Sequence, residues 1–171
     1  MFKPTLACIA TALTIASASA IAGHTNNVLT TDLYGTEQVS NGMSQRIAGD
    51  PNGRGEAYVF GIDGDPQTLC YVLTVEKIQL VPVGAGMAAH IHEGPRGANG
   101  PVVAVLAGPE DGNAADCLSE YEDGKFPSAE AGIVQRILEN PEQFYINVHN
   151  PQYPNGAIRG QLRYQDPRDV L

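Results

Sequence analysis

Apolar and polar positions alternate along much of the chain, and this period of two is typical of β-strands with one face in a core. The clearest case is the segment 68–79, where four large apolar residues share one parity: Leu69, Tyr71, Leu73 and Val75. Shorter runs of the same type predict further strands at 30–39, 56–62, 88–93, 102–106, 144–150 and 157–163. Segments rich in Gly, Pro, Asn and Asp separate these runs, so we expect turns between antiparallel strands.

One segment changes to a helical period, with apolar residues at Ile133, Val134, Ile137 and Leu138. Ser128 is the expected N-cap of this helix, and Asn140-Pro141 is expected to end it. The short helix precedes the penultimate predicted strand, 144–150. The sequence therefore predicts an all-β fold, an antiparallel Greek-key sandwich or barrel with one short helix.

The first 22 residues have the organisation of a signal peptide. Lys3 supplies the positive charge, residues 6–18 are apolar and small, and Ala18-Ser19-Ala20 has the form of a cleavage site. The apolar stretch is too short to span a bilayer, and no other stretch is long enough, so we do not expect an integral membrane protein. We expect a secreted or periplasmic protein with one domain at 23–165 and a flexible tail at 166–171.

Charge narrows the range of partners. Removing the leader takes away Lys3 and no acid, which leaves nine Lys and Arg against 19 Asp and Glu, a formal net charge of −10. Such an acidic protein is a poor binder of nucleic acid and of anionic membranes. The expected partner is a metal ion or an extracellular protein or surface.

The mature chain keeps two cysteines, Cys70 and Cys117, the second of which lies in a segment, 108–125, predicted to be a long acidic loop. An even pair in an oxidising compartment is most simply one disulfide. The alternative is a thiolate metal ligand, but neither cysteine has a partner at metal-ligand spacing.

Three of the four histidines lie on predicted strands. His90 and His92 are two residues apart, so they project from one face, with Ala89 and Ile91 behind them on the core side. His149 lies on the 144–150 strand opposite an apolar face formed by Phe144, Ile146 and Val148. If the three rings lie within roughly 8 Å, they can share one Zn²⁺ or Cu²⁺ ion and leave a position open for water. The alternative is that they are half-exposed strand residues hydrogen-bonded to loop backbone.

Four neighbouring residues could assist such a site. Glu93 could accept a hydrogen bond from a ligand or bind the metal weakly, but a solvated acid at the strand end is the preferred interpretation. Tyr145 and Asn147 share the face of His149. Arg159 could guide an anion to the site, or simply be an exposed strand residue. No catalytic residue is assigned, because no G-x-S-x-G motif and no recognisable pairing of a Ser or Cys nucleophile with a base is present. No phosphate-binding loop or organic cofactor site is indicated either.

Several segments together resemble the chordin-type CHRD domain: 88–94, 97–103, 145–150 and 154–162. The segment 68–75 is similar to a bacterial secreted branch of that family, and the resemblance covers roughly residues 33–163. In animals such domains occur in an extracellular antagonist of bone morphogenetic proteins. The resemblance therefore implies an exported binding domain.

The CHRD family is also distantly similar to copper/zinc superoxide dismutase, an eight-stranded Greek-key barrel. By motif, His90, His92 and His149 match its copper ligands, and Arg159 matches the arginine that steers superoxide. No histidine remains between His92 and His149, so a zinc site of the dismutase type is not expected. The first hypothesis is a binding protein, not an enzyme, with one three-histidine copper site. The others are a copper-only, dismutase-like enzyme and a metal-free interaction or matrix module.

Overall fold

The computed structural model describes residues 27–40, 48–166 and 168, so the expected leader and most of the expected tail lie outside the described residues. Nine strands occur in these ranges: β1 (Val28–Tyr34), β2 (Arg54–Ile62), β3 (Asp65–Glu76), β4 (Ala88–Glu93), β5 (Val102–Leu106), β6 (Asn113–Ser119), β7 (Phe144–Asn150), β8 (Tyr153–Gln161) and β9 (Arg163–Tyr164). They are joined by the helix α1 (Ile133–Glu139) and by the short 3₁₀ turns η1 (Gly35–Glu37) and η2 (Pro141–Gln143).

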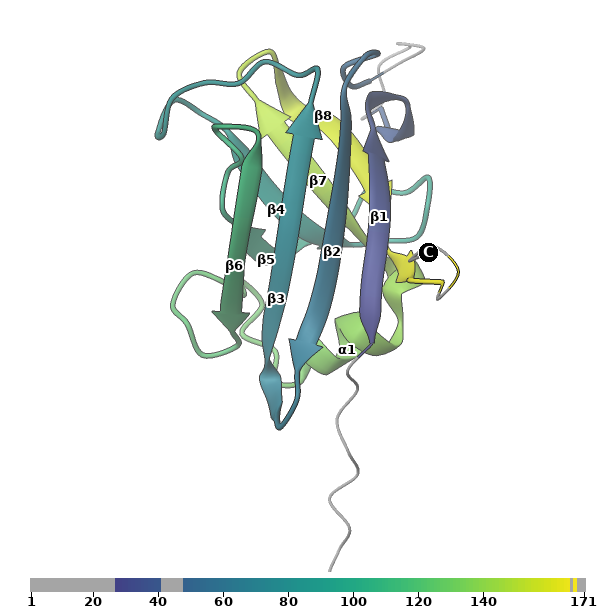
Figure 1. Cartoon of the computed structure of the whole chain (residues 1–171), viewed down its shortest axis with the longest axis vertical. Helices are drawn as coiled ribbons and strands as arrows, with labels where there is room; N and C mark the ends of the chain where they lie inside the picture. The colour runs from purple at the N-terminus through teal and green to yellow at the C-terminus, as the bar shows by residue number, and fades with distance from the viewer. Residues whose placement is uncertain (1–26, 41–47, 167, 169–171) are drawn as a thin grey trace, which may run out of the picture.

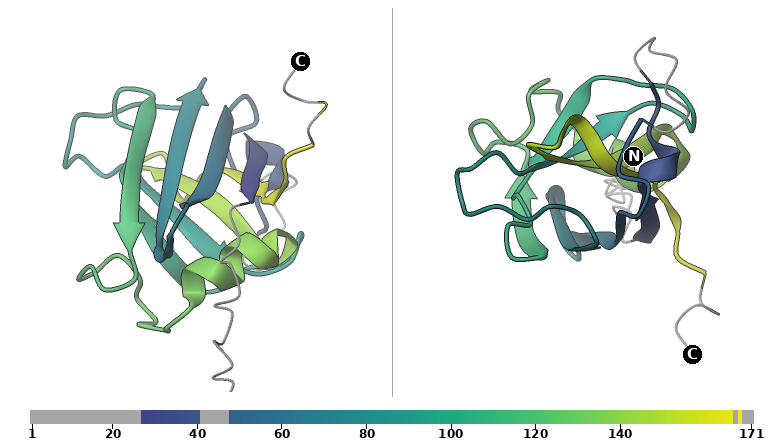
Figure 2. Two further views of the ribbon diagram at one scale, coloured as in Figure 1. Left: turned by 60° about the horizontal axis from the view of Figure 1, so that its bottom comes forward. Right: turned by 90° about the horizontal axis from the view of Figure 1, so that it is seen from above.

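The strands form one antiparallel sheet in the order β5-β4-β7-β8-β1-β2-β3-β6, with β9 beside β1. The sheet folds over where β8 meets β1, because these two strands share only the pair Tyr34 and Arg159. Strands β1, β2, β3 and β6 form one layer, and β4, β5, β7 and β8 form the layer behind it (Figure 1). Figure 2 shows the two layers curving around a common interior into a nearly closed barrel. The predicted all-β antiparallel fold is confirmed.

The core lies between the layers and follows the predicted alternation. Leu69, Tyr71, Leu73 and Val75 of β3 all face it, as do Phe144, Ile146 and Val148 of β7. Ala89 and Ile91 of β4 are fully buried on the same side. The side chains between them, including His90 and His92, therefore project from the outer face of the rear layer.

Helix α1 lies at the lower end of the barrel, before β7, as the sequence predicts (Figure 1). Its start differs from the prediction, because Gly132, in the left-handed conformation, is the N-cap and Ser128 lies four residues earlier. Glu120 stabilises this end, since its carboxylate accepts hydrogen bonds from the backbone N–H groups of Gly132 and Val134. The four apolar residues of the helical pattern are all buried.

The strands differ from the sequence prediction in three notable places. The first strand ends at Tyr34 rather than at residue 39, since η1 follows it. The expected acidic loop contains strand β6, whose backbone pairs with β3 although most of its side chains are exposed. Strand β8 begins at Tyr153, inside the expected turn 151–156, because Tyr153 pairs with Asn150.

The predicted disulfide is confirmed. Cys70 and Cys117 are bonded, and they lie directly opposite each other on β3 and β6. The bond ties the edge strand β6 to the front layer and spans 47 residues of sequence. Both thiols are consumed in it, so neither cysteine is free to ligate a metal.

Candidate metal centre

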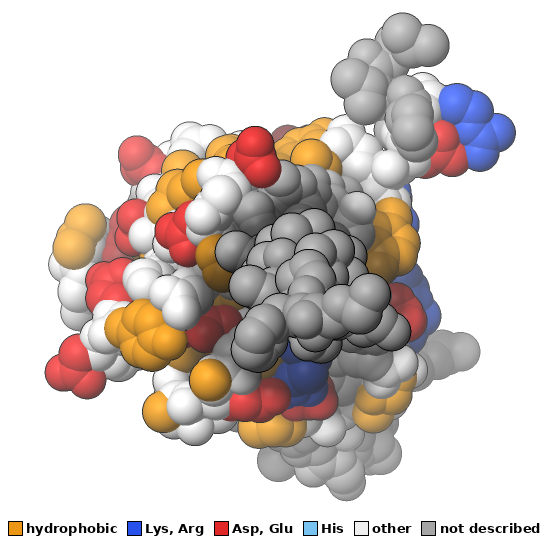
Figure 3. Space-filling view, turned by 90° about the horizontal axis from the view of Figure 1, so that it is seen from below, with side chains coloured by type: hydrophobic (Ala, Val, Ile, Leu, Met, Phe, Trp, Pro, Cys, Tyr) orange, Lys and Arg blue, Asp and Glu red, His pale blue; other side chains and the backbone are white. Residues whose placement is uncertain are grey.

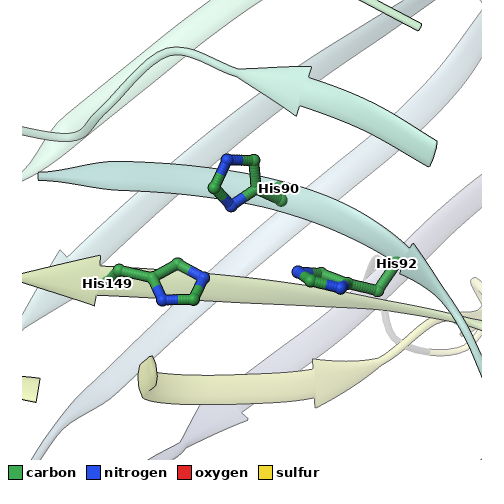
Figure 4. Close-up of side chains that lie close together, drawn as sticks. All are labelled: His90, His92 and His149. Carbon is green, nitrogen blue, oxygen red and sulfur yellow. The ribbon is translucent and has the colours of Figure 1, made fainter. Parts of the chain in front are cut away.

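Strand pairing brings the three histidines together. In the β4–β7 ladder His90 is opposite Asn147, His92 is opposite Tyr145, and His149 is opposite Ala88. His149 is therefore the diagonal neighbour of His90 on the same outer face, a separation at which long side chains meet. Figure 4 shows the three rings grouped over β4 and β7, with one nitrogen of each directed toward the others.

The rings are close enough to share one ion. The ring centres of His90 and His149 are 5.2 Å apart, those of His90 and His92 are 5.7 Å apart, and those of His92 and His149 are 6.3 Å apart. Each residue offers one ligand nitrogen, and these three atoms all lie within 4.8 Å of one another. Nitrogen–metal bonds of about 2 Å require ligand atoms within roughly 4 Å of one another, so small side-chain rotations suffice.

The hydrogen bonds of the rings leave the facing nitrogens free. Nδ1 of His92 lies 2.9 Å from the carbonyl oxygen of Gly100, and Nδ1 of His149 lies 3.0 Å from that of Pro154. A carbonyl only accepts, so both Nδ1 atoms carry the proton and both Nε2 atoms carry a lone pair. One ring nitrogen of each histidine is buried without a hydrogen-bond partner among the described residues: Nδ1 of His90, Nε2 of His92 and Nε2 of His149. This is the donor set that a metal ion needs.

Two departures from regular sheet pairing supply these carbonyl groups. After β4 the chain turns through residues 94–101, which places Gly100 beside His92. A Cβ at Gly100 would overlap the Glu93 carbonyl oxygen, so glycine is required there. The β7–β8 register shifts after Val148, which leaves the Pro154 carbonyl free for His149. Sequence reasoning missed both carbonyl groups, because backbone acceptors have no residue-type signal.

Burial keeps the imidazoles neutral. It is the main cause that lowers the pKa of His90 to about 4, and the neighbouring His149 and His92 add to the effect. Burial also lowers the pKa of His92, with smaller contributions from His149 and Arg159, against the hydrogen bond to Gly100. Burial lowers the pKa of His149, although its hydrogen bond to Pro154 opposes the shift. Neutral rings at pH 7 keep their lone pairs available for a metal.

Tyr145 and Asn147 surround the cluster on β7, and both are buried. The Tyr145 ring is stacked on the His92 ring, with centres 4.9 Å apart and an angle of 8° between the planes. Its hydroxyl oxygen accepts a hydrogen bond of 3.1 Å from the Gly100 N–H group. The Asn147 side-chain oxygen accepts a hydrogen bond from the Gln38 amide. These contacts hold the Tyr145 and Asn147 side chains in place beside the cluster.

Glu93 and Arg159 have structural partners. The carboxylate of Glu93 forms two hydrogen bonds, of 2.6 and 3.0 Å, with the Arg136 guanidinium of α1, on the face of β4 opposite His92. Arg159 is 2% exposed, which differs from the exposed strand arginine that the sequence suggested. Its guanidinium donates hydrogen bonds to the Asn99 side chain and to the carbonyl groups of Pro95 and Ala98.

The rest of the described surface lacks a comparable cluster of ligand groups. A groove of about 660 Å³ lies over β1, β2 and β3 in the other layer, and none of the three histidines lines it. Seen from below, acidic side chains are spread among apolar ones on the left of the view (Figure 3). Within the described ranges, no helix has the length and apolar content needed to cross a bilayer.

The fold and the cluster define a small antiparallel β-barrel protein with three histidines on one outer sheet face. The model of the CHRD domain matches residues 29–162, and the chain therefore belongs to the CHRD domain family. CHRD domains are interaction modules that are typically extracellular, and the disulfide is consistent with such a compartment. Neither the comparison with curated proteins nor the comparison with solved structures found a significant match.

Proposed function

We propose that this chain is an exported CHRD-domain binding protein that holds one copper ion on His90, His92 and His149. One observation carries the proposal: three buried ring nitrogens, none with a hydrogen-bond partner among the described residues, lie within 4.8 Å of one another. Buried polar atoms without a partner are costly, and a metal ion would satisfy all three at once.

The chemistry of the donor set favours copper. All three donors are neutral imidazoles, and copper lies above zinc in the general order of affinity for such ligands. Both mature cysteines are in the disulfide, and Glu93 is paired with Arg136, so thiolate and carboxylate donors are engaged elsewhere. A bound ion would supply Lewis acidity or electron exchange, while His92 and His149 keep their Nδ1 protons on backbone carbonyl groups.

The structural observations do not favour the dismutase hypothesis. An arginine that guides an anion must present its N–H groups to solvent near the metal. Arg159 is 2% exposed and donates to Asn99, Pro95 and Ala98. We therefore propose binding of copper, as storage or transfer outside the cytoplasm, and not dismutation.

The test is a copper titration of the metal-free mature protein, followed by visible and electron paramagnetic resonance spectroscopy. We expect one ion per chain, with nitrogen hyperfine coupling from imidazole ligands. His90→Ala and His149→Ala should each lower the affinity at least 100-fold. His24→Ala, which removes the remaining histidine, is the matched control and should leave the affinity unchanged.

Two outcomes would change the assignment. If His90→Ala and His149→Ala bind copper as tightly as the wild type, the site is wrong and the metal-free interaction module replaces it. If the copper-loaded protein removes superoxide faster than the same amount of free copper, the enzyme hypothesis replaces the binding role. Export is tested separately by N-terminal sequencing of the protein recovered outside the cytoplasm, which should begin near residue 23.

A further inference from the structure

A row of three side chains extends from the histidine cluster across the outer face of the rear layer. His92 of β4, Tyr145 of β7 and Arg159 of β8 come from three neighbouring strands. The guanidinium carbon of Arg159 lies 3.4 Å from the centre of the Tyr145 ring, and the His92 ring is stacked on that same tyrosine. A positive charge is thus held behind one of the three copper-binding rings.

No carboxylate of the described residues lies within hydrogen-bonding distance of the Arg159 guanidinium. Its hydrogen-bond acceptors are the Asn99 side-chain oxygen at 3.1 Å, the Ala98 carbonyl at 2.7 Å and the Pro95 carbonyl at 3.3 Å, all of them neutral. The carboxylate of Glu37 attracts the positive charge of Arg159, but it forms an ion pair with the exposed Arg96. Because the guanidinium is buried, water screens it weakly.

We propose that Arg159 sets the oxidation-state preference of the site and biases it toward Cu(I) over Cu(II). The inference rests on the proposed copper site. The three ligands carry no negative charge, so each unit of charge on the ion is repelled by the guanidinium. At a separation of roughly 10 Å and an effective dielectric constant of about 20, the additional charge of Cu(II) changes the affinity ratio by about tenfold.

The same repulsion acts on a proton at His92, since Arg159 is among the causes that lower the pKa of that imidazole. Arg159 also has a positioning role that is separable from its charge. Arg159 holds the 94–101 segment by donating to the carbonyl groups of Pro95 and Ala98. The Gly100 carbonyl oxygen of that segment accepts the hydrogen bond from Nδ1 of His92. A test must therefore change the charge without moving the segment.

Asn99→Asp does this at the guanidinium, because the new carboxylate would take the place of the amide oxygen. It also removes the hydrogen bond from the Asn99 amide to the Val39 carbonyl oxygen, so the position of the segment is checked by NMR. Affinities for Cu(I) and Cu(II) are measured by competition with chelators specific for each ion, the former without oxygen. We expect Asn99→Asp and Arg159→Gln each to raise the Cu(II) affinity relative to Cu(I) by about tenfold. Arg159→Lys, which keeps the charge, should stay within about threefold of the wild type.

Arg163→Gln is the control for overall charge, because Arg163 is exposed and lies near Asp32, and the ratio should not change. Nitrogen-15 NMR of metal-free Asn99→Asp should still show the proton of His92 on Nδ1, which establishes that the segment has not moved. Arg159→Gln is informative only if it folds, whereas Asn99→Asp preserves every hydrogen bond of the guanidinium.

The outcomes separate the inference from the function on which it rests. If the wild type binds copper through its three histidines and Asn99→Asp leaves the ratio unchanged, the role of Arg159 is refuted and the copper site stands. If Arg163→Gln shifts the ratio as much as Asn99→Asp, the effect is one of overall charge and the inference fails. If the wild type binds neither ion, both proposals fall.

Discussion

The metal-free protein should lose stability as the pH falls from about 6.5 to about 4. Over this interval the histidines of the unfolded chain take up protons, while His90 resists protonation because its pKa in the folded protein is about 4. The unfolded state therefore binds more protons, and the free energy of unfolding falls with falling pH. Above pH 6.5 the imidazoles are neutral in both states, and their contribution to stability is constant.

The magnitude follows from the difference between the two pKa values of His90. A shift from 6.5 to about 4 corresponds to about 3 kcal/mol of stability lost on acidification. Partial exposure of the ring reduces this, so we expect about 2–3 kcal/mol. His92 and His149 have lowered pKa values as well and act in the same direction.

The assay is urea unfolding at pH 7.0, 5.5 and 4.0 in the presence of a chelator, for the wild type and His90→Gln. Glutamine stays neutral at every pH, so the stability difference between the two proteins isolates His90. That difference should decrease by about 2–3 kcal/mol from pH 7.0 to 4.0. Glu93, whose pKa is lowered by its hydrogen bonds with Arg136, contributes to acid unfolding of both proteins and cancels. A difference that stays constant within about 0.5 kcal/mol would refute the idea that burial holds His90 neutral.

Three further predictions concern the surroundings of the site. Replacing Cys70 and Cys117 together by alanine should lower the free energy of unfolding by about 4 kcal/mol, from the loop of 47 residues, without changing copper affinity; an unchanged urea midpoint would contradict this. Gly100→Ala should displace the carbonyl that holds His92, so NMR should show loss of the Nδ1 proton signal and copper affinity should fall at least tenfold. Glu93→Gln should lower the free energy of unfolding by at most about 1 kcal/mol, because the ion pair with Arg136 is half-exposed, and should leave copper affinity within about twofold. A larger loss of copper affinity would identify Glu93 as a ligand.

The strands that the sequence predicted best are those whose alternation reports burial on one side. In β3 and β7 one parity is apolar and faces the core, and both strands were located close to their true positions. Strand β6 escaped prediction because it lies at the sheet edge and only Leu118 of its side chains is buried. Its existence depends on backbone pairing with β3 and on the disulfide, and neither contact can be read from local pattern.

The proximity of the three histidines follows from parity and pairing, which is why the sequence could suggest it. The side-chain spacing of the H-x-H pair is a property of one strand, and the addition of His149 needs only that β7 lie beside β4. The orientation of the rings depends instead on two irregular backbone segments. Their carbonyl groups reach His92 and His149 only after the 94–101 segment has folded over the sheet and the β7–β8 register has shifted. Metal binding itself stays a prediction.

Arg159 shows why the polar side of a strand can mislead. Its parity placed it correctly opposite the core, and exposure seemed to follow, but the 94–101 segment covers that face and buries it. A buried guanidinium with neutral acceptors loses its hydration without gaining an ion pair, which costs several kcal/mol, and an apolar side chain could cover Tyr145 without that cost. The hydrogen bonds of Arg159 to the 94–101 segment give it a structural role, but that role does not depend on its positive charge. The guanidinium lies against the Tyr145–His92 stack, so its charge would act on any cation bound by the three imidazoles. A buried positive charge beside a set of neutral ligands favours the ion of lower charge. This effect on a bound ion would explain why a charged side chain is buried at this position in spite of its desolvation cost.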